Sequence, residues 1–320
     1  MIQRIINGLK RRGLRGMIAR CGQKAIGFSK TQEEIDALYY FLDHTVDITA
    51  LKPTNDPELR AIQIGMGKLL QVFDKECAKY NLRYWLDYGT LLGAVRHKGF
   101  IPWDDDMDVA MPREDYDRVL ELMHDELAAY GINVREGGDY DYRDGLSRLG
   151  FELNSIQTGL WLDIFPMDHI HTDKTAAEIT PALNVCWDKA HHRYDKSVGK
   201  KSKAAMIEEK HGIFQAVNDE GGKNIIYYHG PEFGAPDHII VDEETVFPLT
   251  KLEFEGHAYS APGNYDAYLK IIYGDYMKFP HNGVEQHEDP YGVHVKKRHN
   301  KFHINMEEMY QKLDRALREL

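Results

Sequence analysis

The amino-acid sequence predicts an α+β fold in which a mixed sheet is flanked by helices and followed by a largely helical C-terminal part. Between residues 57 and 170, stretches with apolar residues at helical spacing alternate with short apolar or aromatic runs that are typical of strands. This alternation indicates an α/β or α+β core. The 320 residues can bury a substantial core, and 42% hydrophobic with 28% charged residues is typical of a soluble globular protein.

The individual elements are bounded by residues that end helices or strands. The first helix of the core ends near Tyr80 and Asn81, and Pro112 ends a strand that begins at Met107. In chain order, the sequence predicts a helix at 57–80, a strand at 84–88, a short helix at 91–95, a strand at 107–111, a helix at 113–130, strands at 146–153 and 160–165, a hairpin at 246–259 and a helix at 304–320.

The charge is distributed unevenly along the chain. Residues 1–30 contain eight basic side chains and no acidic one, whereas the other 290 residues carry 32 basic and 51 acidic groups. An acidic body of this kind repels phosphates, so we expect no nucleic-acid partner. We therefore divide the chain into a basic amphipathic arm and helix at 1–50, a core at 57–170 and a C-terminal region at 171–320.

The basic arm has apolar residues at mostly three- and four-residue spacing over residues 2–28, which predicts an amphipathic helix. One interpretation is that residues 1–28 lie on an anionic membrane surface. The other is that they pack on the acidic body of the same chain or of a sister subunit. Three widely spaced cysteines, and the lack of a secretory signal or a spanning apolar stretch, favour a cytoplasmic location, on the inner membrane face if the arm binds lipid.

Paired carboxylates provide the strongest chemical signal. Asp106 and Asp108 alternate on a predicted strand, so both side chains lie on one face and repel each other unless a cation intervenes. Hard oxygen ligands select Mg²⁺ or Mn²⁺. A solvated acidic turn or a structural calcium loop is the alternative, but the apolar segments on both sides favour a metal site, because buried unpaired charge is costly.

Two further features support a phosphate-handling site. Gly89 and Thr90 precede a short helix, where a close backbone approach, a hydroxyl and helix N-terminal N–H groups can hold a phosphate. A Gly-Thr pair alone is usually only a turn, and the downstream carboxylates make it more specific. Asp163 lies in the apolar strand 160–165, where we expect a third metal ligand or a base, with an arginine-paired strand-end acid as the alternative.

The segment 84–120 resembles the LicD family, which includes phosphocholine transferases of bacterial surface glycans and fukutin-related proteins. The resemblance is carried by residues 84–93 and 102–108, and again downstream by residues 246–249 and 264–277. It covers roughly residues 60–280 and leaves out the basic N-terminus. Two separate matches in the same order make chance similarity a poor explanation.

The resemblance implies a nucleotidyltransferase-like catalytic core, with the region after residue 170 on the acceptor side. It further implies metal-assisted transfer of a phospho-substituent from a CDP-activated donor, such as CDP-choline or a CDP-linked polyol, to a hydroxyl of a glycan or its lipid-linked precursor. The metal acids would be Asp106 and Asp108, with Asp163 the third. Fifteen residues separate Thr90 from Asp106, which is more than in the smallest nucleotidyltransferases.

Cationic and aromatic residues complete the candidate site. Arg96 lies between the Gly-Thr turn and the acids, where it can face a phosphate or pair with a core acid, and Arg148 is a second candidate for phosphate binding. Asp168 is a weaker alternative base. If choline is transferred, an aromatic face could hold its ammonium group. The nearby aromatic residues are Tyr84, Trp85, Tyr88, Trp103 and Trp161.

Two other functions compete with this interpretation. A nucleotide-sugar glycosyltransferase also holds its metal with an Asp-x-Asp pair, although the upstream Gly89 and Thr90 fit such an enzyme poorly. A membrane-associated scaffold with an inactive transferase fold is the non-enzymatic alternative, and the intact acids at 106, 108 and 163 argue against it. Five histidines within residues 281–303 match no zinc-binding spacing.

Overall fold

The computed structural model describes residues 36–136, 149–153, 160–197, 223–227, 239–279 and 305–320, with a few single positions between 205 and 218. It separates into two compact units, Met1–Ile48 with Met277–Gly283, and Thr49–Tyr276 with Val284–Leu320. The predicted arm at 1–28, Arg148 and the histidines of 281–303 lie outside the described residues. In the smaller unit, residues 36–45 are helical.

The described residues of the larger unit form a seven-stranded mixed sheet with the order β1-β2-β5-β4-β3, and β6 joins it between β5 and β7. Strands β2 and β5 are parallel, and the other neighbouring pairs are antiparallel. This sheet confirms the predicted α+β class. The strands are β1 (Trp85–Leu86), β2 (Asp108–Pro112), β3 (Ile132–Glu136), β4 (Leu149–Leu153), β5 (Trp161–Thr172), β6 (Lys223–Tyr227) and β7 (Ile240–Asp242).

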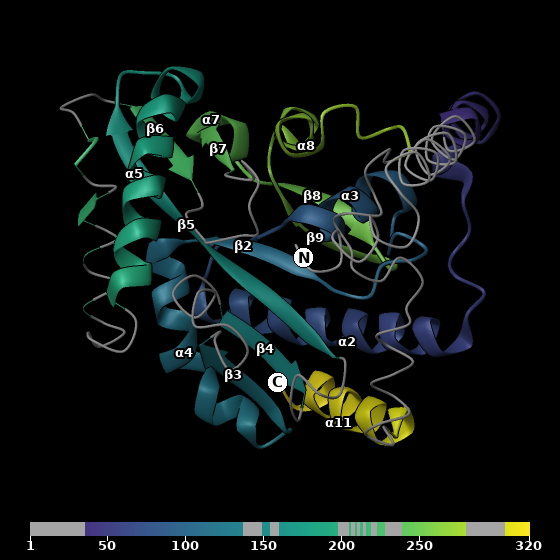
Figure 1. Ribbon diagram of the computed structural model, residues 1–320. Coiled ribbons are helices and arrows are strands. Elements are labelled where there is room, and N and C mark those ends of the chain that lie inside the picture. Colours follow the sequence, from purple (N-terminus) through teal and green to yellow (C-terminus); the bar gives the residue numbers. More distant parts are fainter. Residues whose placement is uncertain are drawn as a thin grey trace, which may run out of the picture. The chain divides into compact units, whose positions relative to one another are not determined.

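Helices and a separate hairpin surround this sheet. Figure 1 shows the long strand β5 crossing the sheet and α11 lying alongside α2. The remaining elements are η1 (Ile48–Ala50), α2 (Pro57–Tyr80), α3 (Tyr88–His97), α4 (Arg113–Ala128), α5 (Ala176–Ser197), α7 (Glu243–Val246), β8 (Thr250–Phe254), β9 (His257–Ala261), α8 (Tyr265–Tyr273) and α11 (Met306–Glu319).

Helix α2 forms where the sequence predicts it, because both of its ends carry capping residues. Asp56 accepts hydrogen bonds from the backbone N–H groups of Glu58 and Leu59 at 3.0 and 3.4 Å, and Pro57 follows at the first helical position. At the other end, Asn81 adopts the left-handed conformation with φ of 54°. The buried apolar stripe of α2 packs into the main hydrophobic core.

Other element boundaries differ from the prediction. Strand β1 is shorter than 84–88, because Asp87 caps helix α3, which begins at Tyr88. The hairpin spans 250–261, since residues 243–246 are helical instead of extended. The region after residue 170 is also less purely helical than expected, because β6 and β7 add to the sheet.

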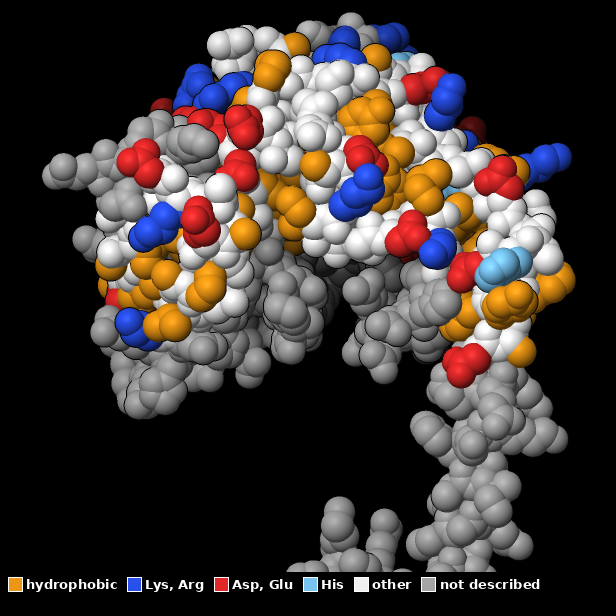
Figure 2. Space-filling model, turned by 90° about the horizontal axis from the view of Figure 1, so that it is seen from above, with side chains coloured by type: hydrophobic (Ala, Val, Ile, Leu, Met, Phe, Trp, Pro, Cys, Tyr) orange, Lys and Arg blue, Asp and Glu red, His pale blue; other side chains and the backbone are white. Residues whose placement is uncertain are grey.

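The surface of the described residues carries both charges. On the face shown in Figure 2, acidic and basic side chains stand in small mixed groups between hydrophobic ones. Within the described part of the chain, no helix has the length and apolar character that crossing a membrane requires.

Candidate active site

The turn between β1 and α3 is joined directly to the start of β2. Asp87 caps α3 by accepting a hydrogen bond from the N–H of Tyr88 at 2.8 Å, and its own N–H donates to the carbonyl of Asp108 at 3.1 Å. The buried Thr90 hydroxyl oxygen accepts a hydrogen bond from the N–H of Asp108 at 2.9 Å. Tyr88 has φ of 38°, a conformation that non-glycine residues avoid and that is often found at functional sites.

Three of the predicted acids lie near one another at this place. Asp108 and Asp163 are register partners on the parallel strands β2 and β5, and the N–H of Asp163 donates to the carbonyl of Met107 at 2.9 Å. Asp106 lies two residues before Asp108 and is half-buried, as is Asp163. The fold therefore brings together residues that are more than fifty positions apart in the sequence.

The electrostatics of the cluster disfavour its ionised state. Burial raises the pKa of Asp108 well above its usual range, and the negative charges of Asp106, Asp163, Asp104 and Asp87 raise it further. Burial also raises the pKa of Asp104, and its neighbour Asp106 adds to the shift. Among the described residues, no Lys or Arg forms an ion pair with Asp104, Asp106 or Asp108.

Gly89 allows one of these acids to approach the helix. A Cβ atom at Gly89 would lie 2.8 Å from Oδ2 of Asp104, which is too close for a side chain. The observed close neighbour of this glycine is therefore a carboxylate of the cluster. Phosphate binding by Gly89 and Thr90 stays a prediction.

Arg96 is buried beside the cluster with unused hydrogen-bonding capacity. Its Nη1 donates to the carbonyl of Tyr276 at 2.9 Å, whereas its buried Nε has no hydrogen-bond partner. Burial lowers its pKa to about 10, so the guanidinium still carries its charge at neutral pH. It interacts electrostatically with Asp104 without forming an ion pair.

Three residues of the cluster are absent from the predicted site: Asp87, Asp104 and Tyr273. Burial raises the pKa of Tyr273, and the charges of Asp108, Asp104, Asp87 and Asp106 raise it further, so its phenol stays protonated beside the acids. Asp87 and Asp104 belong to the segment that carries the family resemblance. Tyr273 lies in the second matching segment, and that resemblance was the signal that could have found it.

The structure also narrows the secondary candidates. Arg113 binds both carboxylate oxygens of Asp168, at 2.9 and 2.8 Å, so the weaker expectation that Asp168 acts as a base is disfavoured. Of the five candidate aromatic residues, Tyr84, Trp85 and Trp161 are buried in the core. Tyr88 and Trp103 are half-buried and retain some exposure.

The metal prediction stays a prediction, because the described residues hold no preformed ligand cage. Within the described residues, no three His, Cys, Asp or Glu side chains are arranged as a group that could hold a metal ion. The clustered donors are all carboxylates, which are the hard oxygen ligands that Mg²⁺ and Mn²⁺ prefer. The residue types fit such an ion, and the ligand assignment to Asp106, Asp108 and Asp163 stays a proposal.

A mixed sheet with a capped turn-helix beside clustered aspartates defines a nucleotidyltransferase-type site. Comparison with known families agrees, because residues 81–191 match the LicD/FKTN/FKRP nucleotidyltransferase domain. Residues 81–191 of the chain are therefore similar to the nucleotidyltransferase domain of the LicD family. This confirms the family resemblance noted in the sequence.

The relatives that this chain matches include enzymes named as transferases of phosphate-linked groups. The chain is 26% identical over 261 residues to the lipopolysaccharide cholinephosphotransferase LicD of Haemophilus influenzae, covering 73% of this chain and 96% of that protein. It is 25% identical over 194 residues to the human ribitol 5-phosphate transferase FKRP, covering 61% of this chain and 28% of FKRP. The mouse FKRP is 56% identical over 99 residues, which are 30% of this chain and 19% of that protein. The expectation of a phosphotransferase is confirmed by these relatives.

Proposed function

We propose that this protein transfers a phospho-substituent from a CDP-activated donor to a hydroxyl group of a surface glycan or its lipid-linked precursor. The observation that carries the proposal is the buried carboxylate cluster around Asp108 and Asp163, which lies beside the N-terminus of α3. The relatives named for cholinephosphate and ribitol 5-phosphate transfer support the same type of reaction.

A divalent cation fits the chemistry of this cluster. Asp106, Asp108 and Asp163 would hold Mg²⁺ or Mn²⁺, and the ion would neutralise charge on the diphosphate of the donor. Burial raises the pKa of Asp108, and the negative charges of the neighbouring aspartates raise it further. An ion bound there would remove this repulsion.

The protein's own groups then position the reactants and move one proton. The acceptor oxygen attacks phosphorus, the bond from phosphorus to the CMP oxygen breaks, and CMP leaves with that electron pair. Asp163 takes the proton of the acceptor hydroxyl. Arg96, whose buried Nε has no hydrogen-bond partner among the described residues, would bind a donor phosphate, and the protonated Tyr273 would donate a hydrogen bond in the same region. Such a reaction depends mainly on positioning and electrostatics.

The transferred group would be phosphocholine or a related phosphopolyol or phosphonate. Choline would favour an aromatic surface, which Tyr88 or Trp103 could supply because both remain partly exposed. A polyol would instead need hydrogen-bonding groups. Substitution of Trp103 by Leu would therefore weaken binding of a choline donor more than that of a ribitol donor.

The basic arm would place the enzyme at the inner membrane face, where a lipid-linked acceptor would be found. Residues 1–30 carry eight basic and no acidic side chains, which would attract anionic lipid. Shortly after them, the helical segment 36–45 exposes Leu38, Tyr40 and Phe41. Sedimentation with anionic liposomes should be lost when residues 1–28 are deleted, whereas an arm that packs on protein would leave sedimentation unchanged.

The test of the reaction is a donor panel. The purified chain is incubated with Mg²⁺, an acceptor glycan and CDP-choline, CDP-ribitol, CDP-glycerol or one of several nucleotide sugars. CMP release from a CDP-linked donor, with a phosphodiester on the acceptor, supports the proposal. Turnover of a nucleotide sugar alone would favour the glycosyltransferase alternative.

A further inference from the structure

We propose that Arg60, Gln63 and Glu255 are positioning residues that hold the aspartate loop, residues 98–107, so that its acids face Asp163. The aspartate loop connects α3 to β2 and carries Asp104 and Asp106. The inference rests on the proposed function, because its purpose is to place the acids that the reaction needs.

The turn of the β8–β9 hairpin fixes the beginning of the aspartate loop. Glu255 donates its N–H to the carbonyl of Lys98 at 2.8 Å and accepts the N–H of Phe100 on Oε1 at 3.2 Å. Glu255 has φ of 49° and Gly256 φ of 79°, which turns the hairpin tightly enough to insert this side chain. A Cβ at Gly99 would lie 2.5 Å from Oε1 of Glu255, so a larger residue there would displace this carboxylate.

Helix α2 fixes the middle of the aspartate loop. The amide nitrogen of Gln63 donates to the carbonyl of Asp104 at 2.9 Å and to that of Ile101 at 3.4 Å. Gln63 is fully buried, so its amide would be costly without these partners. It thereby fixes the backbone of an acid whose carboxylate lies against Gly89.

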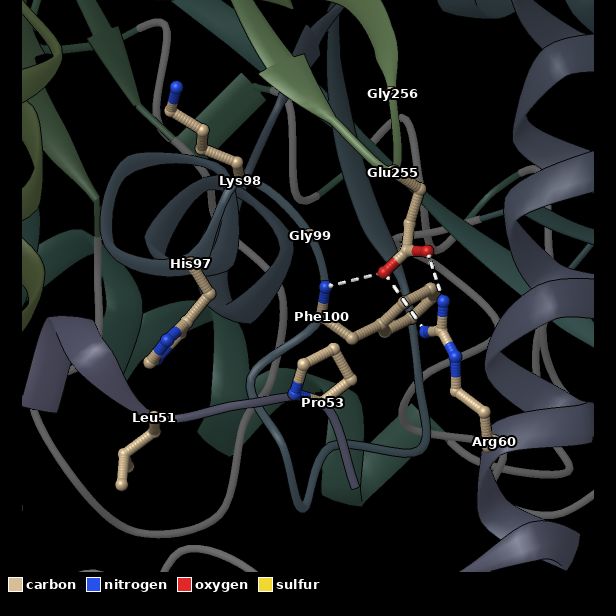
Figure 3. A pocket seen from close by; sticks show the side chains of 9 residues that line it. All are labelled: Leu51, Pro53, Arg60, His97, Lys98, Gly99, Phe100, Glu255 and Gly256. Carbon is tan, nitrogen blue, oxygen red and sulfur yellow. Dashed lines mark hydrogen bonds and ion pairs between the residues drawn. The ribbon is translucent and has the colours of Figure 1, made fainter. Parts of the chain in front are cut away.

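Arg60 couples the two attachments. Its guanidinium binds both oxygens of Glu255, at 3.1 and 2.7 Å, and Nη1 also donates to the side-chain oxygen of Gln63 at 3.3 Å. Figure 3 shows Glu255 reaching between the backbone nitrogen of Phe100 and Arg60, on the wall of a cavity of about 230 Å³. Arg60 and Glu255, which are 195 positions apart, thus belong to one network that holds the aspartate loop between residues 98 and 104.

This arrangement does more than stabilise the fold, because the loop leads directly into the acids. A displacement of about 1 Å at a catalytic group can cost about 100-fold in rate. We therefore expect loss of the Gln63 amide to have a stronger effect on kcat than on Tm.

The experiment compares the full-length wild type with Gln63→Met, which keeps the volume but removes both donors. Lys68→Met is the matched control, because Lys68 also joins α2 to a distant segment through an ion pair with Asp314 of α11. The readouts are hydrogen exchange of the amides in residues 98–107, kcat for CMP release at saturating donor and Mg²⁺, and Tm.

We expect Gln63→Met to speed exchange in the aspartate loop and to lower kcat at least about tenfold at a temperature where it is folded. Lys68→Met should change neither. Exchange and kcat like those of the control would overturn the proposal. If Gln63→Met does not fold, Glu255→Asp, which withdraws the carboxylate from Phe100, replaces it.

The two proposals fail in different ways. If the wild type releases no CMP from any CDP-linked donor, the proposed reaction is wrong. The exchange measurement still decides whether Gln63 positions the loop, because it needs neither donor nor metal.

Discussion

Asp108 and Asp163 lie side by side as register partners on β2 and β5, the one parallel pair among the strand pairs of the described sheet. Parallel pairing brings two acids from distant parts of the sequence to neighbouring backbone positions. Burial and the surrounding carboxylates raise the pKa of Asp108, so the site opposes its own ionisation. Buried carboxylates that repel one another lower the stability of the fold, so we expect them to be kept because the function needs them.

Asp108→Asn should therefore separate activity from stability. We expect the rate of CMP release to fall at least about 1,000-fold, because the variant loses a ligand for the divalent ion that would neutralise the donor's diphosphate. Without added metal, the variant should be as stable as the wild type or more stable, because the substitution removes one negative charge from a cluster of aspartates that repel one another. CMP release and thermal unfolding at pH 8 check both parts, and retained turnover would contradict the assignment.

Arg96→Lys should weaken binding of the CDP-linked donor. A lysine has one side-chain nitrogen, so it cannot bond to the Tyr276 carbonyl and also present a second nitrogen to a phosphate. We expect kcat/KM for the donor to fall about tenfold or more. Arg83→Lys is the control, since Arg83 is half-exposed and pairs with Glu114 and Asp115. Equal kcat/KM values for the two variants would argue that Arg96 contributes only to packing.

Gly93→Ala tests how closely α3 packs against the chain that follows it. A Cβ at Gly93 would lie 2.4 Å from the carbonyl oxygen of Gly99, so we expect a loss of about 2 kcal/mol or more in the free energy of unfolding. Gly212→Ala is the matched control, because a Cβ at the helical Gly212 would meet no atom of the described residues within 4 Å. Urea unfolding measures both variants, and an equal effect would contradict the close packing.

His97 should make the protein sensitive to acid. Burial and the neighbouring Arg96 lower its pKa to about 4, and both ring nitrogens are buried without a hydrogen-bond partner. In the unfolded chain the pKa of His97 is about 6.5, so as the pH falls the unfolded state binds this proton before the folded state does. His97 therefore lowers the free energy of unfolding as the pH falls from about 6.5 to 4.

His97→Gln removes this titration. The free energy of unfolding of the wild type should fall relative to that of the variant as the pH is lowered from 7.5 to 4.5. A difference between the two proteins that does not depend on pH would show that His97 keeps an ordinary pKa in the folded state.

The sequence predicted those parts of the fold and site that depend on local pattern. Helix α2 carries its own caps and apolar stripe, and the alternation of Asp106 and Asp108 is visible along one segment. Long-range contacts could not be predicted in this way. Gln63 and Glu255 look like ordinary surface polar residues in the sequence, and only the packing of α2 and the hairpin brings them to the aspartate loop.

Local competition explains the errors at element ends. Asp87 follows an aromatic run that is typical of a strand, yet its side chain caps the next helix and ends β1 after two residues. The strands β6 and β7 escaped prediction because their short apolar runs acquire partners only through the extended end of β5. Tyr273 reaches the acids from another part of the chain, so spacing alone could not reveal it.

The most direct test of the central claim is a titration of Mn²⁺ in the presence of CDP, followed by the electron paramagnetic resonance signal of the free ion. We predict that the wild type binds Mn²⁺ and that Asp106→Ala and Asp108→Asn each weaken this binding at least about tenfold. Equal binding by the wild type and both variants would contradict the claim that these aspartates hold a divalent ion.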